Sequence, residues 1–298
     1  MPTPDGFARA LRNRAVLLGI IALLAGGAIA ESPEAQVTRG DSAWERRAEG
    51  SQSGRADAGP IGEAVLAYTR ALEGSPDSIA IRERLLRALY FQGMFAAPDG
   101  APRRAIYARG RDLAEEGIVR LAASIGRTAP FDLRSPDKTA TAAAARPESA
   151  ALFFWAAGHW GLWAEMSSGF AAARQGVAGK IRDYAETVIL IDERYETGGG
   201  HRILGRLHTE APRIPLITGW VDRDIAVANL ERAVALAPRD PWNRLYLADA
   251  LLRFRPRRRA EAMAMLEELI AELPRPAFIL QDLSVQADAR QILARAAS

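Results

Sequence analysis

The residues best suited to chemistry in this chain are its three histidines, His159, His201 and His208. Together they could form a metal site or an acid/base set. His201 and His208 are seven residues apart, which is about 10 Å along a helix, too far for both to coordinate one ion. We therefore expect structural histidines and predict neither a metal site nor any other cofactor.

The second feature is a glycine-rich turn at residues 198–200, which is followed by His201 and Arg202. Gly200 and Gly205 resemble part of a phosphate-binding loop, but no lysine or hydroxyl residue follows in the required place, so we reject nucleotide binding. A helix that begins here would offer free backbone amides, and with Arg202 these suit a carboxylate ligand. We favour the alternative, in which the glycines form a tight turn and Arg202 makes an internal salt bridge.

No other pattern in the sequence is typical of an enzyme. It has no nucleophile elbow, no paired catalytic carboxylates and no cofactor fingerprint. The absence of cysteine excludes thiol catalysis, disulfides and a lipid-modified cysteine. We predict that the protein is not an enzyme; the alternative is an enzyme that pairs His201 with Glu193 or Glu196.

Charge gives no general case for nucleic acid as a partner. The chain has 39 basic and 36 acidic residues. Three of the basic residues and one acidic residue lie before residue 31, which leaves 36 basic and 35 acidic residues in the rest of the chain. A body this close to neutral lacks the clustered basic face that a nucleic-acid backbone requires. The composition, with 49% hydrophobic and 25% charged residues, is that of an ordinary folded protein.

The amino-terminal 30 residues have the pattern of a secretory signal peptide. Three arginines precede an apolar run at 15–30, which ends in Ala28-Ile29-Ala30. The run is short for a bilayer span of about 20 residues. We expect the signal peptide to be cleaved and the mature protein to be soluble in the periplasm. Only an uncleaved signal peptide would anchor it to the membrane. Residues 31–60 are polar and indicate a flexible linker, so we expect a helical repeat domain at 61–298.

One spacing recurs three times and predicts the fold. Steps of four and three residues place one small and two further apolar side chains on one helix face, and a proline five residues later closes the helix. This is typical of the second helix of a tetratricopeptide-like unit, and the last two prolines are 36 residues apart, close to the usual repeat of about 34. We expect an all-α solenoid of helical hairpins, which works by presenting a surface to a partner. The three copies are Ala64, Tyr68, Ala71 and Pro76; Ala226, Leu230, Ala233 and Pro238; and Ala262, Leu266, Leu269 and Pro274.

The helix expected at 151–166 carries large aromatic residues on more than one face, among them Trp155 and Trp163. It is too short to span a bilayer, so it must be buried between neighbours or line an apolar cavity. We favour core packing, since aromatic side chains stabilise mainly through buried area.

Two stretches resemble motifs of the T-component family of TRAP transporters, the TatT-like proteins. The resemblance covers roughly residues 61–275, and its Gly-Gly-x-His-Arg-x-Leu-Gly stretch is the more specific part. The first stretch is Ala151 to Gly158 with Gly161 and Trp163; the second comprises Asp192, Tyr195, Gly199, Gly200, His201, Arg202, Ile203, Leu204 and Gly205.

The resemblance implies a periplasmic, trimeric helical scaffold without enzyme activity, which docks the solute-binding protein of a TRAP-type importer. It also implies an apolar pore, through which a hydrophobic or organic-acid ligand would pass. The alternatives are a general adaptor of the cell envelope and a carrier that works alone. The residues expected near the pore or the partner are Trp155, Trp163, Gly199, Gly200, His201, Arg202 and Gly205.

Overall fold

The structure, a computed structural model, describes residues 31–167 and 176–297. The predicted signal peptide, at residues 1–30, lies outside them. The described residues form twelve α-helices with short 3-10 and π turns and no strand, so the all-α prediction is confirmed. No helix among them has the length and hydrophobicity needed to cross a membrane.

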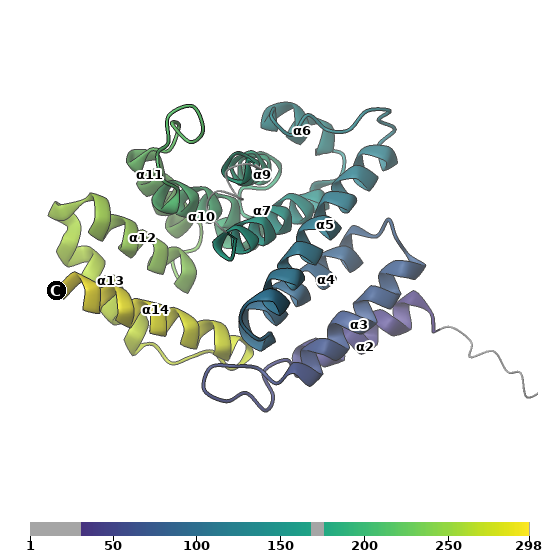
Figure 1. The fold of residues 1–298 in the computed structure, drawn as a ribbon, viewed down its shortest axis with the longest axis horizontal. Helices are drawn as coiled ribbons and strands as arrows, with labels where there is room; N and C mark the ends of the chain where they lie inside the picture. Colours follow the sequence, from purple (N-terminus) through teal and green to yellow (C-terminus); the bar gives the residue numbers. More distant parts are fainter. Residues whose placement is uncertain (1–30, 168–175, 298) are drawn as a thin grey trace, which may run out of the picture.

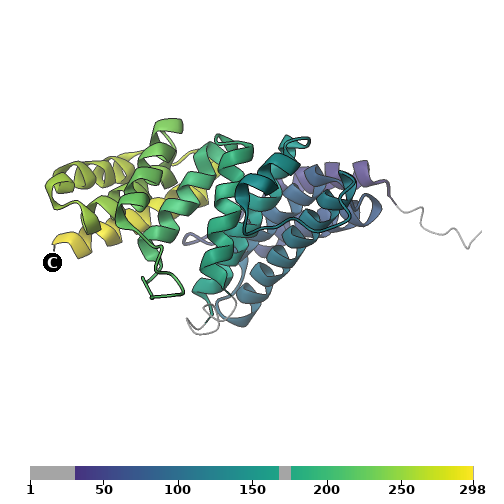
Figure 2. The same ribbon diagram turned by 90° about the horizontal axis from the view of Figure 1, so that it is seen from above.

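The helices form a curved body, with residue 31 and the carboxyl terminus at opposite ends (Figures 1 and 2). In chain order they are α2 (Pro33–Glu45), α3 (Ala58–Gly74), α4 (Ile79–Phe91), α5 (Ala101–Ser124), α6 (Pro136–Ala143), α7 (Ala150–Glu165), α9 (Val177–Ile191), α10 (Tyr195–Glu210), α11 (Arg223–Leu236), α12 (Pro241–Phe254), α13 (Arg259–Ala271) and α14 (Ile279–Ala297).

The interpretation of residues 31–60 as a flexible linker is wrong for residues 33–45, which form α2. Ser32 caps this helix by accepting a hydrogen bond from the Ala35 amide at 3.2 Å. Its buried positions are Gln36, Gly40 and Ala43, and the helix packs along α3. These positions have helical spacing but are mostly not apolar, so a search for apolar periodicity misses them.

The nine apolar positions of the recurring spacing all lie in the core. Each is at most 2% exposed, and α3, α11 and α13 each end before the proline that was expected to close the helix. Each of the three packs against the helix before it: α3 on α2, α11 on α10, and α13 on α12. The spacing therefore marks the inner faces of three helix pairs.

The aromatic helix α7 is buried in the middle of the molecule, as its composition predicts. It packs against α4, α5, α9 and α10, and ten of its sixteen residues are buried. Phe153 has no exposed surface and contacts Phe131 and Tyr184 through ring edges or tilted faces. Core packing thus accounts for most of its aromatic side chains.

The last helix brings the carboxyl-terminal part of the chain back to the amino-terminal part. α14 begins beside the segment that follows α2 and runs from there to the carboxyl terminus at the far end of the molecule (Figure 1). Arg47 donates a hydrogen bond to the Ala277 carbonyl, and Leu280, 2% exposed, belongs to the apolar cluster of α2, α3 and α4. The row of helices is therefore joined at its two ends.

Replacing Leu280 with alanine is expected to loosen this junction. The change removes a buried side chain at the only apolar contact between α14 and the amino-terminal cluster that the described residues show, so we expect a loss of about 2 kcal/mol in the free energy of unfolding. Urea unfolding measures this loss, and amide exchange should rise first in residues 276–297. Unchanged exchange there would contradict the assignment of Leu280 as the junction.

Candidate functional site

The glycine-rich stretch forms the start of α10, where the backbone reverses sharply. Glu196, Thr197 and Gly198 have positive φ angles of 48°, 60° and 82°. Beyond them, a Cβ atom on Gly199 would lie 2.4 Å from the Phe154 ring of α7. One on Gly200 would lie 2.8 Å from a side-chain carbon of α9. These two glycines therefore allow three helices to meet, and they carry no ligand-binding atom beyond the backbone.

Gly205 has the same kind of role one turn further along. A Cβ atom there would lie 2.5 Å from Cγ of Leu230 on α11 and 3.1 Å from the Ala226 carbonyl oxygen. Leu230 is itself the large residue of the recurring spacing. Gly205 thus allows α10 and α11 to approach each other closely.

His201 links α10 to Glu193, in the turn before α10, and to Asn229 on α11. Its Nδ1 lies 2.7 Å from Oδ1 of Asn229, whose own amide group donates to the Ile225 carbonyl, and its Nε2 lies 3.0 Å from Oε1 of Glu193. Both ring nitrogens are thus engaged by side chains of the protein, which holds the ring in place between α11 and the turn before α10.

Glu193 completes this joint as a shared anion. Arg232 donates two hydrogen bonds of 2.7 Å to its two oxygens, and these, with His201, lower the pKa of the Glu193 carboxyl to about 2. Of the two carboxylates considered as catalytic partners of His201, only Glu193 contacts it. A carboxylate with so low a pKa holds a proton poorly near neutral pH, which suits an ion-pair network better than proton transfer.

The variant Glu193→Gln is expected to lower the free energy of unfolding by about 1 kcal/mol at pH 7, the scale of a partly exposed ion pair. Because folding depresses the pKa of this carboxyl, its contribution is present above the ordinary value of 4.5 and is lost as pH falls toward 2. Urea unfolding at several pH values measures the difference between variant and original. A difference that stays constant down to pH 2 would refute the role of Glu193.

Arg202 makes the internal salt bridge that we favoured. Its Nη1 lies 3.7 Å from Oδ1 of Asp240 and donates to Oδ1 of Asn243 at 3.0 Å and to the Glu196 carbonyl at 3.2 Å. Thr197 adds a hydrogen bond of 2.6 Å to Asp240. Arg202 therefore ties the strained start of α10 to the start of α12.

Trp155 and Trp163 are not brought together. Trp155 is buried and packs edge to face on Tyr90 of α4, with ring centroids 5.4 Å apart. Trp163 lies in the contact of α7 with α5, where it packs on Trp160 and under the guanidinium of Arg111 at 5.1 Å. The two indoles thus lie in different contacts of α7, Trp155 against α4 and Trp163 against α5.

The other two histidines have structural hydrogen bonds. Nε2 of the fully buried His159 lies 3.1 Å from the Leu86 carbonyl oxygen. Nδ1 of His208 accepts a hydrogen bond of 2.9 Å from the Asp222 amide. Within the described residues, no group of histidine and acidic side chains is arranged to hold a metal ion.

Six polar and aromatic side chains from α4, α7, α10, α12 and α14 are linked by electrostatic interactions that shift their pKa values, and we call this set the inner cluster. Its members are Tyr90, Glu165, Arg202, Arg206, Tyr246 and Asp288. Of the seven residues that the sequence predicts near a pore or a partner, only Arg202 belongs to the inner cluster.

Arg206 is the centre of the inner cluster. Its guanidinium lies 4.5 Å from the centroid of the Tyr246 ring and 3.4 Å from Glu210. Burial by itself lowers the pKa of Arg206, but the interaction with Tyr246 and the carboxylates of Glu210 and Glu165 more than offset this, so the pKa is raised. The positive charge is therefore held firmly in place.

The inner cluster is both crowded and open to water. Glu165 is exposed and Asp288 is partly exposed, yet loss of surrounding water raises the pKa of both carboxyls. Both carboxyls are therefore reached by solvent on one side and surrounded by protein on the other.

One feature of the sequence could have indicated a member of the inner cluster. Arg202 and Arg206 are four residues apart and share a helix face, so Arg202 pointed to Arg206 as well. Tyr90, Glu165, Tyr246 and Asp288 lie on four other helices, and no spacing along the chain relates them. In comparisons with known proteins, no family model and no curated protein matches this chain.

Proposed function

We propose that this chain is a non-enzymatic helical-repeat scaffold of the periplasm that serves as the T-component of a TRAP-type importer. In this role it docks the solute-binding protein of the importer. The observation that carries the proposal is the use of one spacing three times, with all nine apolar positions buried in helix pairs. Stacked helix pairs of this kind are typical of tetratricopeptide-like solenoids, which bind protein partners.

The glycine-rich stretch supports the assignment to the T-component family. Gly199, Gly200 and Gly205 each occupy a place where a side chain would collide with another helix, and His201 and Arg202 tie α10 to α11 and α12. Because several residues of this motif pack between helices at one place, the motif requires a particular arrangement of those helices.

The inner cluster supports the passage or holding of a ligand within this role. The Arg206 side chain is 37% exposed, and its guanidinium lies over the ring of Tyr246. An organic acid with an apolar or aromatic part would meet a cation and aromatic faces at one place. Like the family, the proposed scaffold is a trimer, which light scattering of the purified chain measures directly.

The first test captures partners of residues 31–298 from a periplasmic extract and identifies them by mass spectrometry. The proposal predicts a TRAP-type solute-binding protein, whose affinity is then measured with purified components. Recovery of unrelated envelope proteins, or of none, would contradict the transporter role and favour a general adaptor or an independent carrier.

A second test addresses the inner cluster alone. Arg206→Gln should reduce the ligand mass that native mass spectrometry finds retained on the chain. Arg120→Gln is the matched control: Arg120 is 39% exposed and pairs with Glu116 four residues away, as Arg206 is 37% exposed and pairs with Glu210. Equal retention by both variants would remove the inner cluster from the ligand path without affecting the docking proposal.

A further inference from the structure

The segment between α10 and α11 holds large aliphatic side chains out in solvent. Leu216 is fully exposed, Ile217 is 51% exposed and Ile214 is 37% exposed. The segment projects from the body as a loop in Figure 1 and again in the turned view of Figure 2. We call these three residues the apolar tip.

The apolar tip is held in a defined shape. The buried Thr218 hydroxyl accepts a hydrogen bond of 2.9 Å from the Ile214 amide and donates to the Pro212 carbonyl. The Trp220 indole N–H donates to the Ile217 carbonyl at 3.2 Å. A fixed loop that keeps aliphatic side chains in water is unfavourable on its own, so a role outside the monomer is indicated.

Leu216 adds backbone strain to this exposure. Its φ angle is +68°, in the left-handed region that a leucine rarely adopts. A glycine or asparagine would occupy the position with less strain, and neither would place an aliphatic side chain at the end of the loop. Strain of this kind is found at functional sites, where the surrounding structure maintains it.

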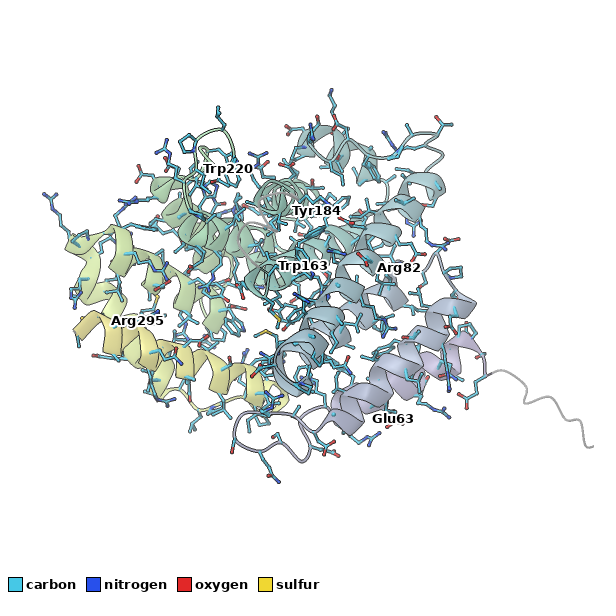
Figure 3. The ribbon with its side chains drawn as sticks, viewed as in Figure 1. Glu63, Arg82, Trp163, Tyr184, Trp220 and Arg295 are labelled. Atoms are coloured by element: carbon cyan, nitrogen blue, oxygen red, sulfur yellow. The ribbon has the colours of Figure 1, made fainter. Side chains whose placement is uncertain are left out.

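The base of the loop is aromatic and positively charged. The Trp220 ring packs on His208 at 5.3 Å and under the Arg182 guanidinium at 4.7 Å, and Figure 3 labels its position. Arg213 donates to the Gly219 carbonyl, and Arg223 lies over the Phe254 ring.

Arg213 and Arg223 remain available to an external anion. Neither makes a salt bridge within the described part of the chain, although the charge of Arg213 contributes to lowering the pKa of the Asp222 carboxyl. Asp222 accepts from the amides that begin α11, and Asp224 pairs with Arg255.

We propose that the apolar tip inserts into the surface of a bilayer that contains anionic lipids. The tip matches the layers of a membrane surface. Its aliphatic side chains suit the acyl chains, Trp220 suits the boundary with the headgroups, and Arg213 and Arg223 suit the anionic headgroups. Three side chains expose roughly a few hundred Å², whereas a stable protein interface needs about 800 Å² from each partner. The lipid surface is therefore the better match.

The test uses residues 31–298, which contain every described helix and lack the apolar run at 15–30. The protein is floated with vesicles of phosphatidylglycerol and phosphatidylcholine, or of phosphatidylcholine alone. We expect binding to the anionic vesicles and a loss of about tenfold in the Leu216→Asp variant. The matched control is Leu273→Asp, since Leu273 is 91% exposed on the loop between α13 and α14.

A second measurement locates the insertion. The chain has no cysteine, so Leu216→Cys and Leu273→Cys each provide one site for an environment-sensitive fluorophore. On anionic vesicles, the label at 216 should shift to the blue and the label at 273 should not. Equal binding of Leu216→Asp, no shift at 216, or no binding by the original chain would each overturn the proposal. So would a Leu216→Asp variant that binds vesicles normally but loses its protein partner, and that result would assign the tip to protein docking.

Discussion

Replacing Gly205 with alanine is expected to lower the free energy of unfolding by about 3 kcal/mol. The new Cβ atom would lie 2.5 Å from Cγ of Leu230 and 3.1 Å from the Ala226 carbonyl oxygen, and neither neighbour has room to move. Leu230 and Ala226 have no exposed surface, so α10 and α11 would have to separate. Urea unfolding followed by circular dichroism measures the loss.

The control for this prediction is Gly179→Ala on α9. No atom lies within 4 Å of the Cβ position there, so the higher helix propensity of alanine should stabilise the protein by up to about 1 kcal/mol. The two glycine-to-alanine substitutions, on neighbouring helices, should thus change the free energy of unfolding in opposite directions. If both variants gained stability, the close approach of α10 to α11 would not be a feature of the protein in solution.

Acid should destabilise the protein through His159. Burial lowers the pKa of this histidine to about 4, from its ordinary value of 6.5, and the hydrogen bond to the Leu86 carbonyl offsets only part of that effect. The unfolded chain therefore binds the proton more readily than the folded one. The stabilisation is complete above pH 6.5 and is lost as pH falls to 4, by about 3 kcal/mol at about 1.4 kcal/mol per pKa unit.

The variant His159→Gln isolates this effect. Glutamine keeps a donor for the Leu86 carbonyl and does not titrate, so the variant should show a shallower decline of stability between pH 6.5 and 4. Other acidic and histidine side chains contribute equally to both proteins, and the difference between the two curves reports His159. Parallel curves would mean that the His159 ring is not kept neutral by burial.

The local elements were largely predictable because they depend on neighbours along the chain. The apolar residues of α4 (Ile79–Phe91) have helical spacing, and Asp222, directly before α11, caps that helix by accepting hydrogen bonds from the Asp224 and Ile225 amides. Segment 33–45 was missed because its buried face carries a glutamine and a glycine, which apolar periodicity does not register. The short helix α6 forms in a proline-rich segment because Pro136 occupies the first turn of the helix, where proline is tolerated.

The glycine-rich stretch shows what spacing alone leaves undecided. The sequence allowed a ligand-binding helix start or an internal joint, because backbone amides and an arginine serve either purpose. The structure places Asp240 and Asn243, at the start of α12, beside Arg202, and Asn229 of α11 beside His201. These residues come from other helices, so only the packing of those helices could decide between the two interpretations.

By itself, the sequence determined that the chain is helical, which faces of α3, α11 and α13 are buried, and where these helices end, since side-chain periodicity and proline act locally. The tertiary structure decided that α14 returns to the amino-terminal cluster and that Arg206 meets Tyr246, Glu165 and Asp288. Such meetings depend on the angles at which helices cross, and these angles follow from the fit of side chains over long sequence separations, which no local pattern records.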